Sequence, residues 1–73
     1  MNFKCIIVDV YELSDEIMQQ YELNFKNRVT LYNYNIKKLE DFAIPDTWKN
    51  KFKIGTVIEN WKEFIEGVVE GEG

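Results

Sequence analysis

Hydrophobic and polar positions follow two different periods along this chain. Residues 3–11 are rich in β-branched and aromatic side chains and leave neither face of a strand cleanly polar. This pattern predicts a central strand that is covered on both sides, or covered on one side and placed at an interface on the other. From residue 56 onward, the apolar positions recur at helical spacing instead.

The segment that follows the first strand, residues 14–25, fits two structures. A helix capped by Ser14 would hold Asp15 and Glu16 in its first turn, where carboxylates are favourable. The alternation of aromatic and polar residues in the second half of the segment fits a strand equally well. We expect a short helix or turn near 14–19, followed directly by a strand.

A hairpin is predicted in the middle of the chain. Lys26 and Asn27 fit a tight turn, because asparagine tolerates the positive φ angle that such turns require. Residues 28–36 then alternate between two faces as the second arm of the hairpin. Residues 37–47 contain the only proline, and we expect a loop with a helical turn there.

Residues 46–54 also fit two structures. Three basic residues alternate with other side chains and predict a strand with a lysine face: Lys49, Lys51 and Lys53. Asp46 as a cap and Gly55 as a stop permit a short helix just as well.

The C-terminal helix is the clearest predicted element. Thr56 followed by Glu59 matches the reciprocal capping box, so we expect the helix to begin at Thr56. Its apolar positions cover one broad face: Val57, Ile58, Trp61, Phe64, Ile65, Val68 and Val69. The predicted fold class is α+β, with a small antiparallel sheet of three to four strands packed against this amphipathic helix. We expect residues 1–73 to form a single domain, with 71–73 as a frayed tail.

Composition limits the chemistry that the chain can perform. Histidine is absent, and the single cysteine, Cys5, lies in an apolar run that favours a buried thiol. Paired carboxylates such as Asp9 and Glu12 are typical of a solvated surface. We therefore expect no enzyme activity, no metal and no cofactor. No apolar run approaches the ~18 residues of a membrane span, so we expect a cytoplasmic protein.

Charge is distributed unevenly in this chain of net charge -4. Residues 1–25 hold one lysine against five acidic residues, and residues 26–53 hold seven basic residues against three acidic ones. Residues 54–73 again hold one lysine against five glutamates. Such an asymmetry bears on association with partners rather than on the fold.

Four glutamates are predicted to form one ridge on the last helix. At about 100° per residue they share a sector of about 60° opposite the apolar face and span roughly 16 Å: Glu59, Glu63, Glu66 and Glu70. Neighbouring glutamates repel by roughly 0.2 to 0.5 kcal/mol per pair, and only Lys62 is placed to relieve them. Glu66 and Glu70 also oppose the helix dipole, and Gly67 weakens the helix. Several departures from the rules of local helix stability on one surface are typical of a functional surface.

The chain is short and rich in isoleucine, lysine and asparagine. It lacks catalytic residues, and its glutamates are aligned on one helix. It resembles the small acidic host-takeover proteins of lytic bacteriophages, and among them the DNA-mimic inhibitors. The resemblance implies an inhibitor in the host cytoplasm that occludes a basic DNA-binding protein, such as an HU-type nucleoid protein, and binds no nucleic acid itself. The predicted ridge would make the contact, with Asp15 and Glu16 as secondary contacts. A homodimer formed through residues 6–10 or through the aromatic hairpin would double the ridge.

Two other functions fit parts of the sequence. A nucleic-acid-binding module would combine basic and aromatic residues of the central segment: Lys37, Lys38, Lys49, Lys51 and Lys53 with Tyr32, Tyr34, Trp48 and Phe52. The negative net charge argues against this function. A self-assembling structural subunit would instead pair the lysine face of one chain with the glutamate ridge of another, and would dissociate in high salt.

Overall fold

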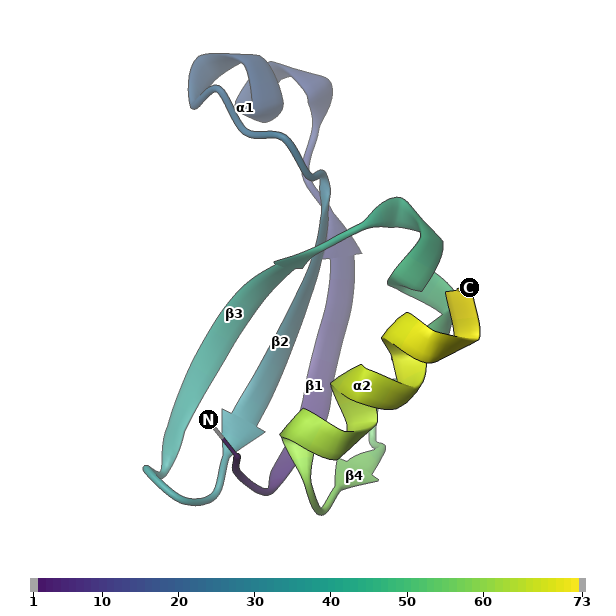
Figure 1. Ribbon diagram of the computed structural model, residues 1–73. Helices are drawn as coiled ribbons and strands as arrows, with labels where there is room; N and C mark the ends of the chain where they lie inside the picture. Colours follow the sequence, from purple (N-terminus) through teal and green to yellow (C-terminus); the bar gives the residue numbers. More distant parts are fainter. Residues whose placement is uncertain (1, 73) are drawn as a thin grey trace.

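Four antiparallel strands form one sheet in the computed structural model, which describes residues 2–72 (Figure 1). The strands are β1 (Cys5–Glu12), β2 (Asn27–Asn33), β3 (Lys38–Ile44) and β4 (Val57–Ile58), in the order β3-β2-β1-β4. The C-terminal helix α2 (Trp61–Glu72) lies across one face of this sheet. The predicted α+β fold class is therefore confirmed.

The hydrophobic core lies between the sheet and α2. The most deeply buried apolar side chains come from β1 and β2: Cys5, Ile7, Val29 and Leu31. Trp61 of α2 packs on this layer, with its ring stacked 5.5 Å from that of Phe3 and 5.7 Å from that of Phe42. The predicted first strand and the apolar side of the last helix thus meet in one core. No helix formed by residues 2–72 covers the opposite face of the sheet (Figure 1).

The connection between β1 and β2 differs from the predicted hairpin. These two strands pair directly, and the chain between them forms α1 (Asp15–Gln20) beyond the end of the sheet (Figure 1). Ser14 caps α1, as predicted, by accepting a hydrogen bond from a backbone N–H at 3.3 Å. Residues 21–26 form no strand. Asn27 begins β2 instead of making a turn, because its buried side chain donates a hydrogen bond to Asp46 at 2.5 Å.

Strand β3 occupies most of the segment for which a loop was predicted. Glu40 shares the inner side of β3 with the core residues and accepts a hydrogen bond from Asn33 at 2.8 Å. Leu39 lies on the open side and is 63% exposed. At these two positions the polar side chain faces the core and the apolar side chain faces solvent. The sequence pattern therefore does not indicate a strand here. Lys37, with a positive φ of 57°, closes the turn that precedes β3.

The segment 46–54 follows the helical alternative. Residues Asp46–Lys51 form a short 3-10 helix, η1, and the strand with a lysine face is not formed. Phe52, directly after η1, is buried in the core, and Lys49 on η1 pairs with Glu12 at 2.8 Å. These two contacts hold η1 against the sheet.

Helix α2 begins at Trp61 rather than at Thr56, so the predicted capping box is wrong. The residues before it pair with β1 as β4, which removes them from the helix. Asn60 caps α2, since its side-chain oxygen accepts a hydrogen bond from the N–H of Glu63 at 2.9 Å. The tail expected over 71–73 falls partly outside the described residues, and residues 71 and 72 belong to α2.

Candidate functional site

Three of the four predicted glutamates stand together on the solvent side of α2. Glu63, Glu66 and Glu70 are exposed, and about 100° per residue places them in one sector of about 60° opposite the packed side. At ~1.5 Å per residue they span roughly 10 Å of the helix axis. None of them forms an ion pair with another residue in the described part of the chain. These three residues are called the α2 ridge below.

Glu59 does not belong to the α2 ridge. It precedes the helix, and its carboxylate lies 3.6 Å from the ammonium group of Lys4. The Glu59 side chain is 76% exposed, and an ion pair so open to solvent contributes little to stability. The prediction that this residue lies on the helix is wrong because the helix starts after it.

Asp15 and Glu16 lie in the first turn of α1 and are exposed. Figure 1 places α1 beyond the end of the sheet and well apart from α2. These two carboxylates therefore form a separate acidic surface and do not extend the α2 ridge.

The observed bounds of α2 change the electrostatic environment expected for the ridge. Glu63 lies in the first turn, where the helix dipole favours a carboxylate. Of the three ridge residues, Glu70 alone lies near the C-terminal end, where the dipole opposes it. Lys51 of η1 lines the same shallow hollow as Glu63 and Gly67. The ridge therefore has a basic neighbour on one side.

The residues of the alternative nucleic-acid site do not gather in one place. Phe52 is buried and Trp48 packs against the core, so neither offers a free ring for base stacking. Tyr32 and Tyr34 contact each other edge to face, with ring centroids 5.1 Å apart. The turn between β2 and β3, with two of the lysines, lies at the other end of the sheet from η1 (Figure 1).

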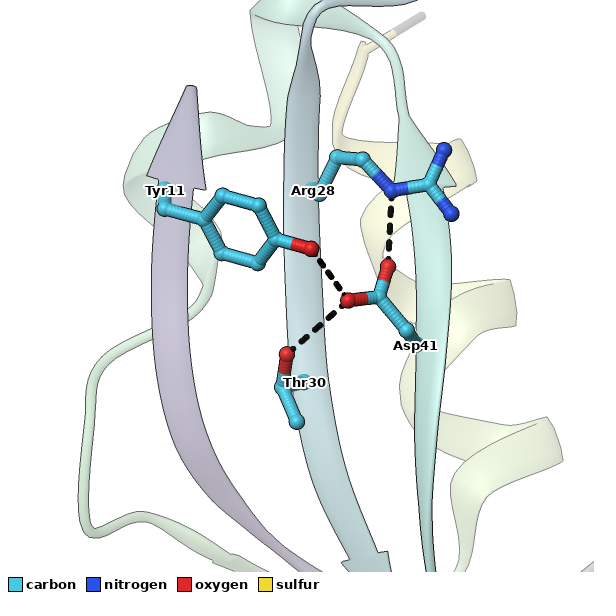
Figure 2. A network of polar contacts seen from close by, with 4 residues as sticks. All are labelled: Tyr11, Arg28, Thr30 and Asp41. Atoms are coloured by element: carbon cyan, nitrogen blue, oxygen red, sulfur yellow. Dashed lines mark hydrogen bonds and ion pairs between the residues drawn. The ribbon is translucent and has the colours of Figure 1, made fainter. Parts of the chain in front are cut away.

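A polar network that the sequence did not predict lies on the open face of the sheet (Figure 2). The Asp41 carboxylate on β3 accepts hydrogen bonds from the hydroxyl of Tyr11, from Arg28 Nε at 2.7 Å and from Thr30 Oγ1 at 3.1 Å. Partial burial acts to raise the pKa of Asp41, but the three donors outweigh it and hold the pKa below its ordinary value. The hydrogen bond to Asp41 also raises the pKa of Tyr11. Each of the four side chains of the network therefore has a hydrogen-bond partner within the chain.

The side chains considered for catalysis are held apart from one another. Cys5 is fully buried, and burial together with the charge of Glu40 raises its pKa to about 11, which keeps the thiol protonated. Glu12 forms an ion pair with Lys49. Asp9 lies on the opposite face of β1 from Glu12. Among the described residues, no group of three or more acidic or cysteine side chains is arranged to hold a metal ion.

Comparison of the chain with protein-family models, with curated proteins and with solved structures finds no match. In the part of the chain that the structure describes, no helix combines the length and apolar character that crossing a membrane requires. The surfaces of the molecule itself are therefore the basis for assigning a function.

Proposed function

We propose that this chain is a non-enzymatic inhibitor that occupies the basic nucleic-acid-binding surface of another protein through the α2 ridge. One observation supports the proposal: Glu63, Glu66 and Glu70 form an exposed row on a helix and have no ion-pair partner among the described residues. A row of carboxylates suits a cleft lined by lysine and arginine, which is how DNA-binding proteins hold the phosphate backbone.

The spacing of the ridge allows it to replace part of a DNA strand. Its carboxylates follow one another at rises of about 4.5 and 6 Å along the helix, whereas each DNA strand presents a charge about every 3.4 Å. The ridge is thus a sparser anionic line, fixed in position by the core contacts of Trp61 and Val68 on the other side of the helix. Following the phage resemblance, an HU-type nucleoid protein of the host is the first target to test.

The experiment measures binding of the pure chain to an HU-type protein and displacement of labelled DNA from that protein. The variant Glu63→Lys/Glu66→Lys/Glu70→Lys should lose both activities. The matched control is Asp15→Lys/Glu16→Lys/Glu22→Lys, which changes the net charge equally at exposed positions in and beside α1. If α1 supplies only secondary contacts, the control should lose much less affinity.

An equal loss in the two variants would show that net charge, and not the α2 ridge, determines binding. Failure of the wild-type chain to bind any basic DNA-binding protein, combined with direct retention of DNA, would overturn the proposal. Both variants change exposed side chains only, so unchanged far-ultraviolet circular dichroism is the expected check on folding.

A further inference from the structure

One apolar row crosses the entire open face of the sheet. Ile6 of β1 pairs in register with Val57 of β4 and with Tyr32 of β2, and Tyr32 pairs in turn with Leu39 of β3. Side chains of directly paired residues point to the same side, so all four strands contribute one member to the row. Leu39 is 63% exposed and Val57 is 48% exposed.

Further apolar side chains widen this row. Tyr34 packs edge to face on Tyr32 and is 41% exposed, and Val8 at the β1 bulge is 44% exposed. A sheet face that meets water alone normally carries polar side chains. A contiguous apolar surface of this kind is typical of a protein interface.

The charged side chains beside the apolar row indicate that the partner bound to this face is a second copy of this chain. Lys4 precedes β1, and its ammonium group lies over the Tyr34 ring on the open face, 5.6 Å from the ring centroid. Asp9 lies on the same face, opposite Thr30. A two-fold axis across the strands would place Lys4 of each copy over Asp9 of the other, which is the reciprocal pairing of a symmetric dimer. Asp9 forms no ion pair within the described residues, and the exposed contact of Lys4 with Glu59 is long, at 3.6 Å.

We propose that the open face of the sheet is the interface of a homodimer, in which two sheets pack face to face with their β1 strands antiparallel. Sheets packed in this way lie about 10 Å apart with strand directions within about 30° of each other. The paired Arg28 and Asp41 would enter or border the interface without leaving an unpaired charge. Each α2 ridge lies on the far side of its own sheet, so dimerisation leaves both ridges exposed (Figure 1).

Sedimentation equilibrium of the full chain tests the dimer. The wild type should have twice the mass of one chain, and Leu39→Asp should have the mass of one chain with unchanged circular dichroism. The matched control is Tyr21→Asp, which removes an equally exposed apolar side chain, at 64%, near α1 and away from the row. This control should remain a dimer.

A charge exchange then tests the orientation of the two copies. Lys4→Asp and Asp9→Lys should each weaken the dimer by at least about tenfold, because each places like charges opposite one another. The combined variant should recover most of that affinity. A monomeric wild type, a dimeric Leu39→Asp or a combined variant no tighter than the single ones would overturn the proposal. A monomer that retains single-stranded DNA through Tyr32 and Tyr34 would assign the face to nucleic acid instead.

Discussion

The hydroxyl group of Tyr11 on β1 donates a hydrogen bond to the carboxylate of Asp41 on β3, although β2 lies between these two strands. Arg28 and Thr30 of β2 donate to the same carboxylate (Figure 2). One acidic side chain therefore links three strands on the open face. Thr30 pairs directly with Asp41, and the other two donors reach the carboxylate on the same face. A shift of one residue would turn Asp41 to the other face of the sheet, so the network favours the observed strand register.

The variant Tyr11→Phe removes the hydrogen bond between β1 and β3 and keeps the ring. We expect it to lower the free energy of unfolding by about 1 kcal/mol, the usual net contribution of such a bond. Chemical denaturation with a fluorescence or circular dichroism signal measures the change. Tyr21→Phe is the control, since Tyr21 is 64% exposed and takes no part in the network. Equal stability of the two variants would contradict a structural role for the bond.

The depressed pKa of Asp41 predicts a loss of stability in acid. The folded-state pKa lies below the ordinary value of 3.8, so the contribution of this carboxylate is complete above that pH. As the pH falls through the lower folded-state value, Asp41 takes up a proton and the contribution is lost. Asp41→Asn should be less stable than the wild type at neutral pH, and the difference should shrink toward pH 2 in thermal unfolding. A difference that is constant with pH would contradict this linkage.

Four elements could be predicted from the sequence because their own residues determine them. The short helix near 14–19 is confirmed as α1, and the strand within 28–36 is confirmed as β2. The apolar run near the start is confirmed as β1, and the helical spacing near the end is confirmed as the packed side of α2. Strand β3 was not predictable in this way, because Asn33 of the neighbouring strand holds Glu40 on the inner side. The predicted turn at Lys26 and Asn27 was wrong for a related reason, as the buried contact of Asn27 with Asp46 depends on η1.

The start of α2 is likewise set by contacts distant in sequence. The N–H of Trp61 donates to the carbonyl of Phe3 at 3.0 Å, while Asn60 accepts from the N–H of Glu63. We expect Asn60→Ala to lower the free energy of unfolding by about 1 kcal/mol, as loss of a helix cap does. Thr56→Ala should cost much less, because Thr56 lies outside the helix. Thermal or chemical unfolding measures both losses. A larger loss of stability in Thr56→Ala than in Asn60→Ala would support the capping box predicted from the sequence instead.

The candidate site was predictable where it depends on local helix geometry. Glu63, Glu66 and Glu70 share one side of α2 because their spacing alone places them there. Glu59 fell outside because the helix boundary depends on tertiary contacts. The Asp41 network had no local signal at all, since its members come from three strands and meet only through strand pairing.

Two glycines allow a comparison with opposite expected signs. At Gly67, inside α2, an added Cβ would meet nothing within 4 Å, so Gly67→Ala should raise the free energy of unfolding by about 1 kcal/mol. That gain corresponds to a rise of roughly 4–8 °C in Tm for a domain of this size. Gly55 has a positive φ of 89°, and Gly55→Ala should lower the Tm through backbone strain. A lower Tm for Gly67→Ala would mean that α2 is not helical at this position.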